Sequence, residues 1–89
     1  MARSAEVTIS NPVGLYADPA KALVNFAKQF NSEISLTYDG KSVNLKSLMG
    51  VVSLGIPHNA HVKVTADGYD EIKAVREIVD KMKEIELTD

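Results

Sequence analysis

The dipeptide Asp39-Gly40 lies between two short segments in which apolar and polar residues alternate along the chain. Alternation with a period of two is typical of β-strands that bury one face. Asp-Gly favours a type I′ turn, because both central residues of that turn need a positive φ. The region therefore predicts a tight antiparallel hairpin, with apolar positions at Ile34, Leu36, Tyr38, Val43 and Leu45.

Before the hairpin, the sequence predicts one strand followed by one helix. Val7 and Ile9 alternate with polar residues, as expected of a strand. Asn31-Ser32 is expected to close the helix. From Pro19 onward the spacing of apolar residues becomes helical, and a single stripe contains Ala20, Leu23, Val24, Ala27 and Phe30.

After the hairpin, the sequence predicts a helix, a strand and a last helix. The compact apolar run over residues 48–54 is interpreted as a short helix, although periodicity alone does not distinguish it from a strand. Alternation from Val62 to Ala66 predicts a strand that stops at Asp67-Gly68. Asp70 is expected to cap the last helix, whose apolar face comprises Ile72, Val75, Ile78, Val79, Met82 and Ile85.

The order of these elements, strand, helix, strand, strand, helix, strand, helix, predicts an α+β fold. Four half-buried strands and three amphipathic helices favour a four-stranded antiparallel sheet covered on one face by three helices. A length of 89 residues fits one domain over residues 1–89.

Composition excludes several kinds of site. The chain has no cysteine, which rules out disulfides and thiolate chemistry. A net charge of −2 without a basic block disfavours sequence-independent binding to nucleic acid. Neither a signal peptide nor an apolar run of roughly 20 residues is recognisable, so we expect a cytoplasmic protein without membrane insertion. No catalytic arrangement or cofactor motif is found, and we expect neither independent catalytic activity nor a cofactor.

Two segments carry a resemblance to a known family. Together with the run Val51-Val52-Ser53-Leu54-Gly55 and the hairpin, they resemble the HPr family, the small histidine phosphocarriers of the bacterial sugar phosphotransferase system. The resemblance covers essentially all 89 residues and implies an open-faced β-sandwich with the element order predicted above. The two segments are Gly14-Leu15-Tyr16-Ala17-Asp18-Pro19-Ala20 and Asn44-Leu45-Lys46-Ser47-Leu48-Met49-Gly50.

The family's phosphotransfer residues are replaced in this sequence. The first segment of the family normally reads Gly-Leu-His-Ala-Arg-Pro-Ala, so Tyr16 stands at the position of the phosphorylated histidine and Asp18 at that of the arginine. In the family, that histidine receives phosphate from enzyme I and passes it to enzyme II proteins. A phenol is protonated near neutral pH, whereas imidazole is nucleophilic there, and a carboxylate repels a phosphoryl group. We therefore expect histidyl phosphotransfer to be impaired.

Both replacements have further interpretations. Asp18 before Pro19 is suited to be the N-cap of the helix, or it takes part in recognising a partner. Tyr16 packs on a neighbour, contacts a partner or is itself phosphorylated. His58 and His61 lie far along the sequence from Tyr16, and two histidines without a carboxylate cluster make a weak metal site. We expect neither a substitute phosphate carrier nor a metal site from them.

Ser47 stands at the position of the regulatory serine in HPr proteins of low-GC Gram-positive bacteria. The resemblance implies phosphorylation by an ATP-dependent HPr kinase/phosphorylase, after which the phosphoserine form binds catabolite control protein A. The alternative is an ordinary N-cap of the short helix. Because Asp18 replaces an arginine that helps to contact this partner in the family, such binding is expected to be weakened or redirected.

The resemblance also implies a partner-binding surface around these two segments. Leu48, Met49 and Val52 either form an exposed apolar patch on it or pack in the core. The full set of residues expected on this surface is Tyr16, Asp18, Ala20, Lys21, Leu48, Met49 and Val52.

Three functions remain open from the sequence. The first is a regulatory HPr-like protein that is phosphorylated on Ser47. The second is a phosphocarrier whose active segment has been altered, naturally or by engineering. The third is a module that binds a partner without modification, through the surface around Tyr16 and Met49.

Overall fold

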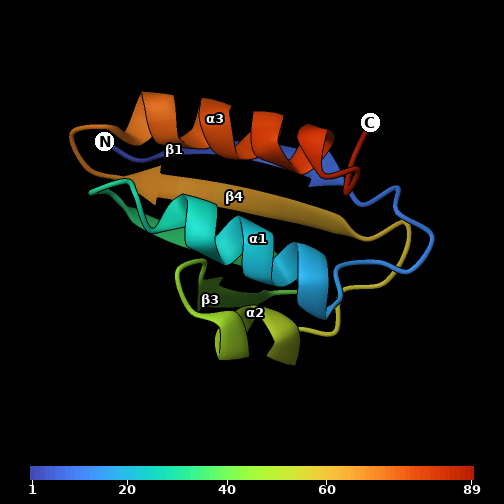
Figure 1. Ribbon diagram of the computed structural model, residues 1–89. Coiled ribbons are helices and arrows are strands. Elements are labelled where there is room, and N and C mark those ends of the chain that lie inside the picture. Colours follow the sequence, from blue (N-terminus) through green and yellow to red (C-terminus); the bar gives the residue numbers. More distant parts are fainter.

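The computed structural model of residues 1–89 contains four strands and three helices in the predicted order (Figure 1). The termini lie near opposite ends of the last helix in this view. The elements are β1 (Arg3–Thr8), α1 (Ala17–Ala27), β2 (Glu33–Tyr38), β3 (Lys41–Asn44), α2 (Leu48–Ser53), β4 (His61–Asp67) and α3 (Glu71–Glu84).

The strands form one antiparallel sheet in the order β1-β4-β2-β3, which confirms the predicted fold class. In the register, Val64 lies opposite Ala5 on one side and Leu36 on the other, and Leu36 lies opposite Val43. These four apolar residues form a row across the sheet, and all of them belong to the core or pack against it. Because side chains alternate between the two faces of a strand, the intervening polar residues lie on the open face.

The hairpin joins β2 to β3 as predicted. Tyr38 and Lys41 are opposite each other in the register, so only Asp39 and Gly40 form the loop. Their φ values are +52° and +77°, which a type I′ turn requires.

The first helix is shorter than predicted, because it ends at Ala27 rather than near Asn31-Ser32. The chain tightens after Ala27 into hydrogen bonds of three-residue spacing, from Gln29 N to Phe26 O and from Phe30 N to Ala27 O. Phe30 therefore lies beyond the helix, although it is buried and its ring meets that of Phe26 edge-on at a centroid distance of 5.6 Å.

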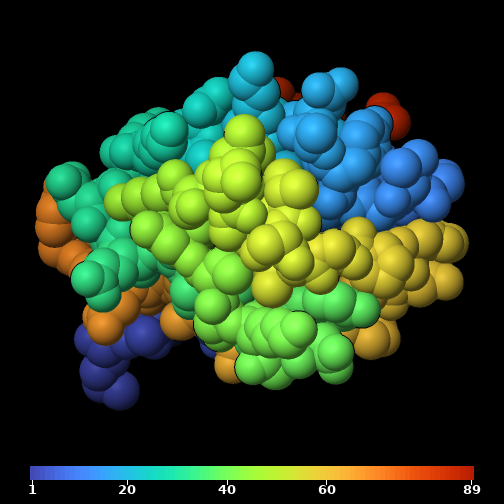
Figure 2. All heavy atoms as spheres, turned by 90° about the horizontal axis from the view of Figure 1, so that it is seen from below, coloured from blue at the N-terminus to red at the C-terminus, as the bar shows by residue number.

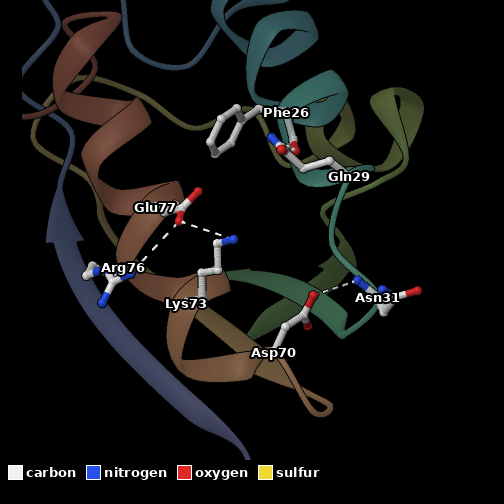
Figure 3. Close-up of polar contacts among 7 residues, drawn as sticks. All are labelled: Phe26, Gln29, Asn31, Asp70, Lys73, Arg76 and Glu77. Atoms are coloured by element: carbon white, nitrogen blue, oxygen red, sulfur yellow. Dashed lines mark hydrogen bonds and ion pairs between the residues drawn. The ribbon is translucent and has the colours of Figure 1, made fainter.

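Asp70 does not cap the last helix through its side chain, which corrects the sequence expectation. Its carboxylate instead accepts a hydrogen bond from the backbone N–H of Asn31 at 2.9 Å (Figure 3). It also accepts hydrogen bonds from the backbone N–H of Ser32 at 3.0 Å and from the Ser32 hydroxyl. These bonds, above all the one from the Ser32 side chain, hold the pKa of the Asp70 carboxyl below its ordinary value. Asp70 thus ties the turn after α1 to the start of α3.

The sequence predicts Ile72 on the buried face of α3, and this prediction is wrong, because Ile72 is 57% exposed. The buried residues of this helix are Ala74, Val75, Ile78 and Met82. At about 100° of rotation per residue, Ile72 lies roughly a quarter turn away from the centre of that face. No helix in the structure is both long and apolar enough to span a membrane.

Candidate functional site

The segment before α1 is held by its main chain against the loop that follows α2. Leu15 N donates a hydrogen bond to Ile56 O at 2.9 Å, and the Leu15 side chain is buried. Gly14 has a φ of +83°, and a Cβ atom at this position would lie 2.3 Å from Ile56 O. Only glycine fits this approach, which places Tyr16 at the junction of loop and helix.

Tyr16 occupies the N-cap position of α1 in an extended conformation, without a side-chain capping bond. Its carbonyl oxygen accepts the first helical hydrogen bond, from Ala20 N at 2.9 Å. Tyr16 is 44% exposed, so the residue lies at the surface.

Asp18 lies inside the first turn of α1, and the prediction that it is the N-cap is wrong. Pro19 can follow it there because a helix leaves its first N–H groups without internal partners, so the missing N–H of proline costs nothing. The Asp18 side chain is exposed and forms none of the ion pairs of the structure. A carboxylate in the first turn is favoured by the helix dipole.

Ser47 is the N-cap of α2, as one of its two interpretations predicted. Its Oγ atom accepts a hydrogen bond from Gly50 N at 3.2 Å, and its own N–H donates to Asn44 O at 3.0 Å. The residue is half-buried, and the first turn of α2 carries no acidic side chain. The capping geometry does not test phosphorylation, which stays a prediction.

The second helix turns one face inward and one face outward. Val51 is buried, whereas Leu48, Met49 and Val52 are 37%, 82% and 44% exposed. Of the two interpretations offered by the sequence, the exposed patch is therefore the one observed. We call Tyr16, Leu48, Met49 and Val52 the α1–α2 patch.

Figure 2 shows the surface that carries the α1–α2 patch, with the atoms of α2 in yellow-green beside the light-blue atoms at the start of α1. The two helices are neighbours in the fold, with Cα atoms of α1 within 8 Å of Cα atoms of α2. Lys21 is exposed on α1, and its contact with a partner stays a prediction. Ala20, in the same helix, is fully buried in the core, so the expectation that it contacts a partner is wrong. Its position on the inward face of α1 explains the difference.

His58 is exposed in the loop after α2, next to Pro57, which packs against Gly14. His61 is exposed in β4, where its Nδ1 atom lies 3.0 Å from the Thr8 hydroxyl oxygen. No group of three or more His, Cys, Asp or Glu side chains is placed to hold a metal ion. The role of Gly14 in positioning Tyr16 is not visible in the sequence, because its partner Ile56 is 42 residues away.

Comparison with known proteins agrees with this geometry. The model of the PTS HPr component phosphorylation site matches residues 3–84. The histidine-containing phosphocarrier protein of Mycoplasma is 32% identical, with a TM-score of 0.96 over 98% of this chain and 99% of that chain. The phosphocarrier protein HPr of Bacillus anthracis is 34% identical, with a TM-score of 0.84 over 90% and 95% of the two chains. The catabolite repression protein Crh of Bacillus subtilis is 38% identical, with a TM-score of 0.73 over 82% and 84%.

Proposed function

Because the chain belongs to the HPr family of the phosphotransferase system, we propose that it is a regulatory member, phosphorylated on Ser47 and impaired in histidyl phosphotransfer. In this proposal it acts in the cytoplasm without catalytic activity of its own. Its partners are an HPr kinase/phosphorylase and, through contacts that Asp18 weakens or redirects, catabolite control protein A. Exchange of phosphate with enzyme I and enzyme II proteins is reduced or lost.

The observation that carries this proposal is the contrast between two positions at the start of neighbouring helices. Tyr16 offers a phenol where phosphotransfer needs imidazole, and Asp18 adds a negative charge in the same turn. Ser47 keeps a hydroxyl group at the start of α2. The relationship to Crh, a relative named for catabolite repression, is in line with a regulatory role.

The surroundings of Ser47 are compatible with a phosphate. The hydroxyl oxygen accepts one hydrogen bond, from Gly50 N, and phosphate oxygens are stronger acceptors of such a bond. No acidic side chain in the first turn of α2 opposes the new charge. Leu48 and Met49 follow directly and are exposed, so a partner has apolar surface beside the modified serine.

The test is an intact-mass measurement after incubation with ATP and an HPr kinase/phosphorylase. We expect the gain of one phosphate, and we expect Ser47→Ala to abolish it. Ser53→Ala is the matched control, because Ser53 is an exposed serine at the other end of α2, and its hydroxyl also forms a hydrogen bond, to Gly50 O at 2.6 Å. It should leave the gain unchanged. Absence of any gain in folded protein would contradict the proposal.

An altered phosphocarrier is the main competing function. It is favoured by the place of Tyr16 at the N-cap of α1, where a histidine would stand at the same helix start. If it is correct, the double substitution Tyr16→His and Asp18→Arg restores phosphorylation by enzyme I and phosphoenolpyruvate. Asp18→Arg alone supplies the matched control, because it removes the repelling charge without supplying imidazole. Failure of the double variant would count against this candidate.

A binding module that needs no modification is the third candidate, favoured by the exposure of Met49 and Tyr16. It predicts that a partner binds the protein and its Ser47→Asp variant with the same affinity. A change in affinity on this substitution would support the regulatory proposal instead.

A further inference from the structure

An unpaired carboxylate lies two residues after Tyr16, the member of the α1–α2 patch that belongs to α1. This carboxylate is that of Asp18, which is exposed in the first turn of α1. The structure has four ion pairs, and Asp18 takes part in none of them. Helix α2, which supplies the rest of the patch, contains no charged residue. Asp18 therefore contributes an unpaired negative charge in the first turn of α1, close in the chain to Tyr16 of the patch.

Lys21 is the cation closest to Asp18 along α1, and it does not neutralise this carboxylate. The two residues are three positions apart, a spacing at which ion pairs form on helices, yet no pair within 4.0 Å is present. Lys46, the nearest cation in sequence to α2, is engaged elsewhere, because its Nζ atom donates to Phe30 O at 2.7 Å.

From this placement we propose that Asp18 determines specificity, by selecting partners that present an arginine or lysine beside an apolar segment. The inference rests on the proposed function, since it assigns the chemistry of the partner that binds the same patch. A charge at the rim of an interface acts mainly on the choice of partner and on the association rate. An acidic partner surface is repelled by Asp18, and a basic one is attracted.

The test uses two synthetic helical peptides as probes. Both carry the same leucine stripe, and the residues flanking it are arginine in one peptide and glutamate in the other. Dissociation constants are measured at low ionic strength from the shifts of the Tyr16, Met49 and Val52 signals in NMR spectra. We expect the arginine peptide to bind at least about threefold more tightly, in the range of exposed charge pairs. We also expect Asp18→Lys to reverse this preference.

Asp80→Lys is the matched control, because it makes the same change in net charge on another helix. Asp80 is an exposed aspartate of α3 without an ion pair, and α3 lies on the far side of α1 from α2 (Figure 1). It should leave the preference for the arginine peptide in place. High salt should weaken that preference, because exposed charges are screened.

Three outcomes would overturn the inference: no shift of the patch signals with either peptide, the same preference in Asp18→Lys, or an equal effect of Asp80→Lys. None of them depends on Ser47, so this test and the phosphorylation test fail separately. A protein that gains phosphate on Ser47 but shows no peptide preference keeps the proposed function and loses only the role of Asp18.

Discussion

The two longer helices begin in different ways, although each has an aspartate close to its first residue. The start of α1 is positioned by main-chain contacts, in which Leu15 N donates to Ile56 O at 2.9 Å. Gly14 fits closely against the same loop. Asp18 takes no part in these contacts and remains exposed.

The start of α3 depends on a side chain instead. The Asp70 carboxylate accepts three hydrogen bonds from Asn31 and Ser32, and thereby joins two segments that are 38 or more residues apart. Where the main chain already holds a helix in place, a carboxylate near its start stays available to a partner. Where a carboxylate supplies the contact, it is committed to the fold.

The largest effect is expected from breaking the main-chain contact at α1. Gly14→Ala places a methyl group 2.3 Å from Ile56 O at a φ of +83°, and we expect a loss of about 3 kcal/mol in the free energy of unfolding. The measurement is denaturant unfolding.

Gly40→Ala is the control for this substitution, because Gly40 also has a positive φ, +77°, but has open space around the added atom. We expect it to cost only about 1 kcal/mol, from backbone strain alone. Equal losses in the two variants would mean that the approach to Ile56 does not anchor α1.

Breaking the side-chain contact at α3 should lower the melting temperature clearly. Asp70→Ala removes the acceptor of three hydrogen bonds and leaves the buried Ser32 hydroxyl without its partner. Thermal unfolding followed by circular dichroism measures the change. A melting temperature equal to that of the unmodified protein would show that water replaces the Asp70 carboxylate at no cost.

The contact at α3 should also depend on pH. Hydrogen bonds from the Ser32 side chain and the Asn31 backbone lower the pKa of Asp70 in the folded state, so its contribution is complete above the unfolded pKa, near pH 4. That contribution is lost as the pH falls further, through the folded pKa. Unfolding measured between pH 2 and 6 should show a decline towards acid that is smaller in Asp70→Ala. An unchanged decline in the variant would assign it to other carboxylates.

The smallest effect on stability is expected at the free carboxylate. Asp18→Ala removes an exposed side chain without hydrogen bonds or ion pairs, and the free energy of unfolding should change by no more than about 0.5 kcal/mol. Denaturant unfolding of this variant beside Asp70→Ala compares the two aspartates directly. A large loss in Asp18→Ala would remove the distinction between them.

Much of the architecture was accessible from local patterns. The alternating apolar residues and Asp39-Gly40 predicted the hairpin correctly, because a two-residue turn depends only on its own residues and their immediate neighbours. The prediction of a longer first helix was wrong at Phe30, where the apolar stripe continues although the helix has ended. Burial alone does not reveal whether a residue is helical.

The candidate site was predicted only in part, for a related reason. The two segments that resemble the HPr family identified Tyr16 and Ser47 and their place at the start of helices. The sequence did not determine whether Met49 was core or surface, and it wrongly placed Ala20 on the surface. The burial of Met49 and of Ala20 depends on which side of its helix faces the sheet. Packing between elements that are distant in the chain decides which side that is.

By itself, the sequence determined the order of strands and helices, the hairpin and the replacement of the family's histidine and arginine by Tyr16 and Asp18. These properties follow from periodicity, turn chemistry and residue identity, all of which are local. The tertiary structure decided that Asp70 is bound within the fold and that Asp18 is free. An aspartate near a helix start can serve either purpose, and the donors that decide between them come from residues far away in the chain.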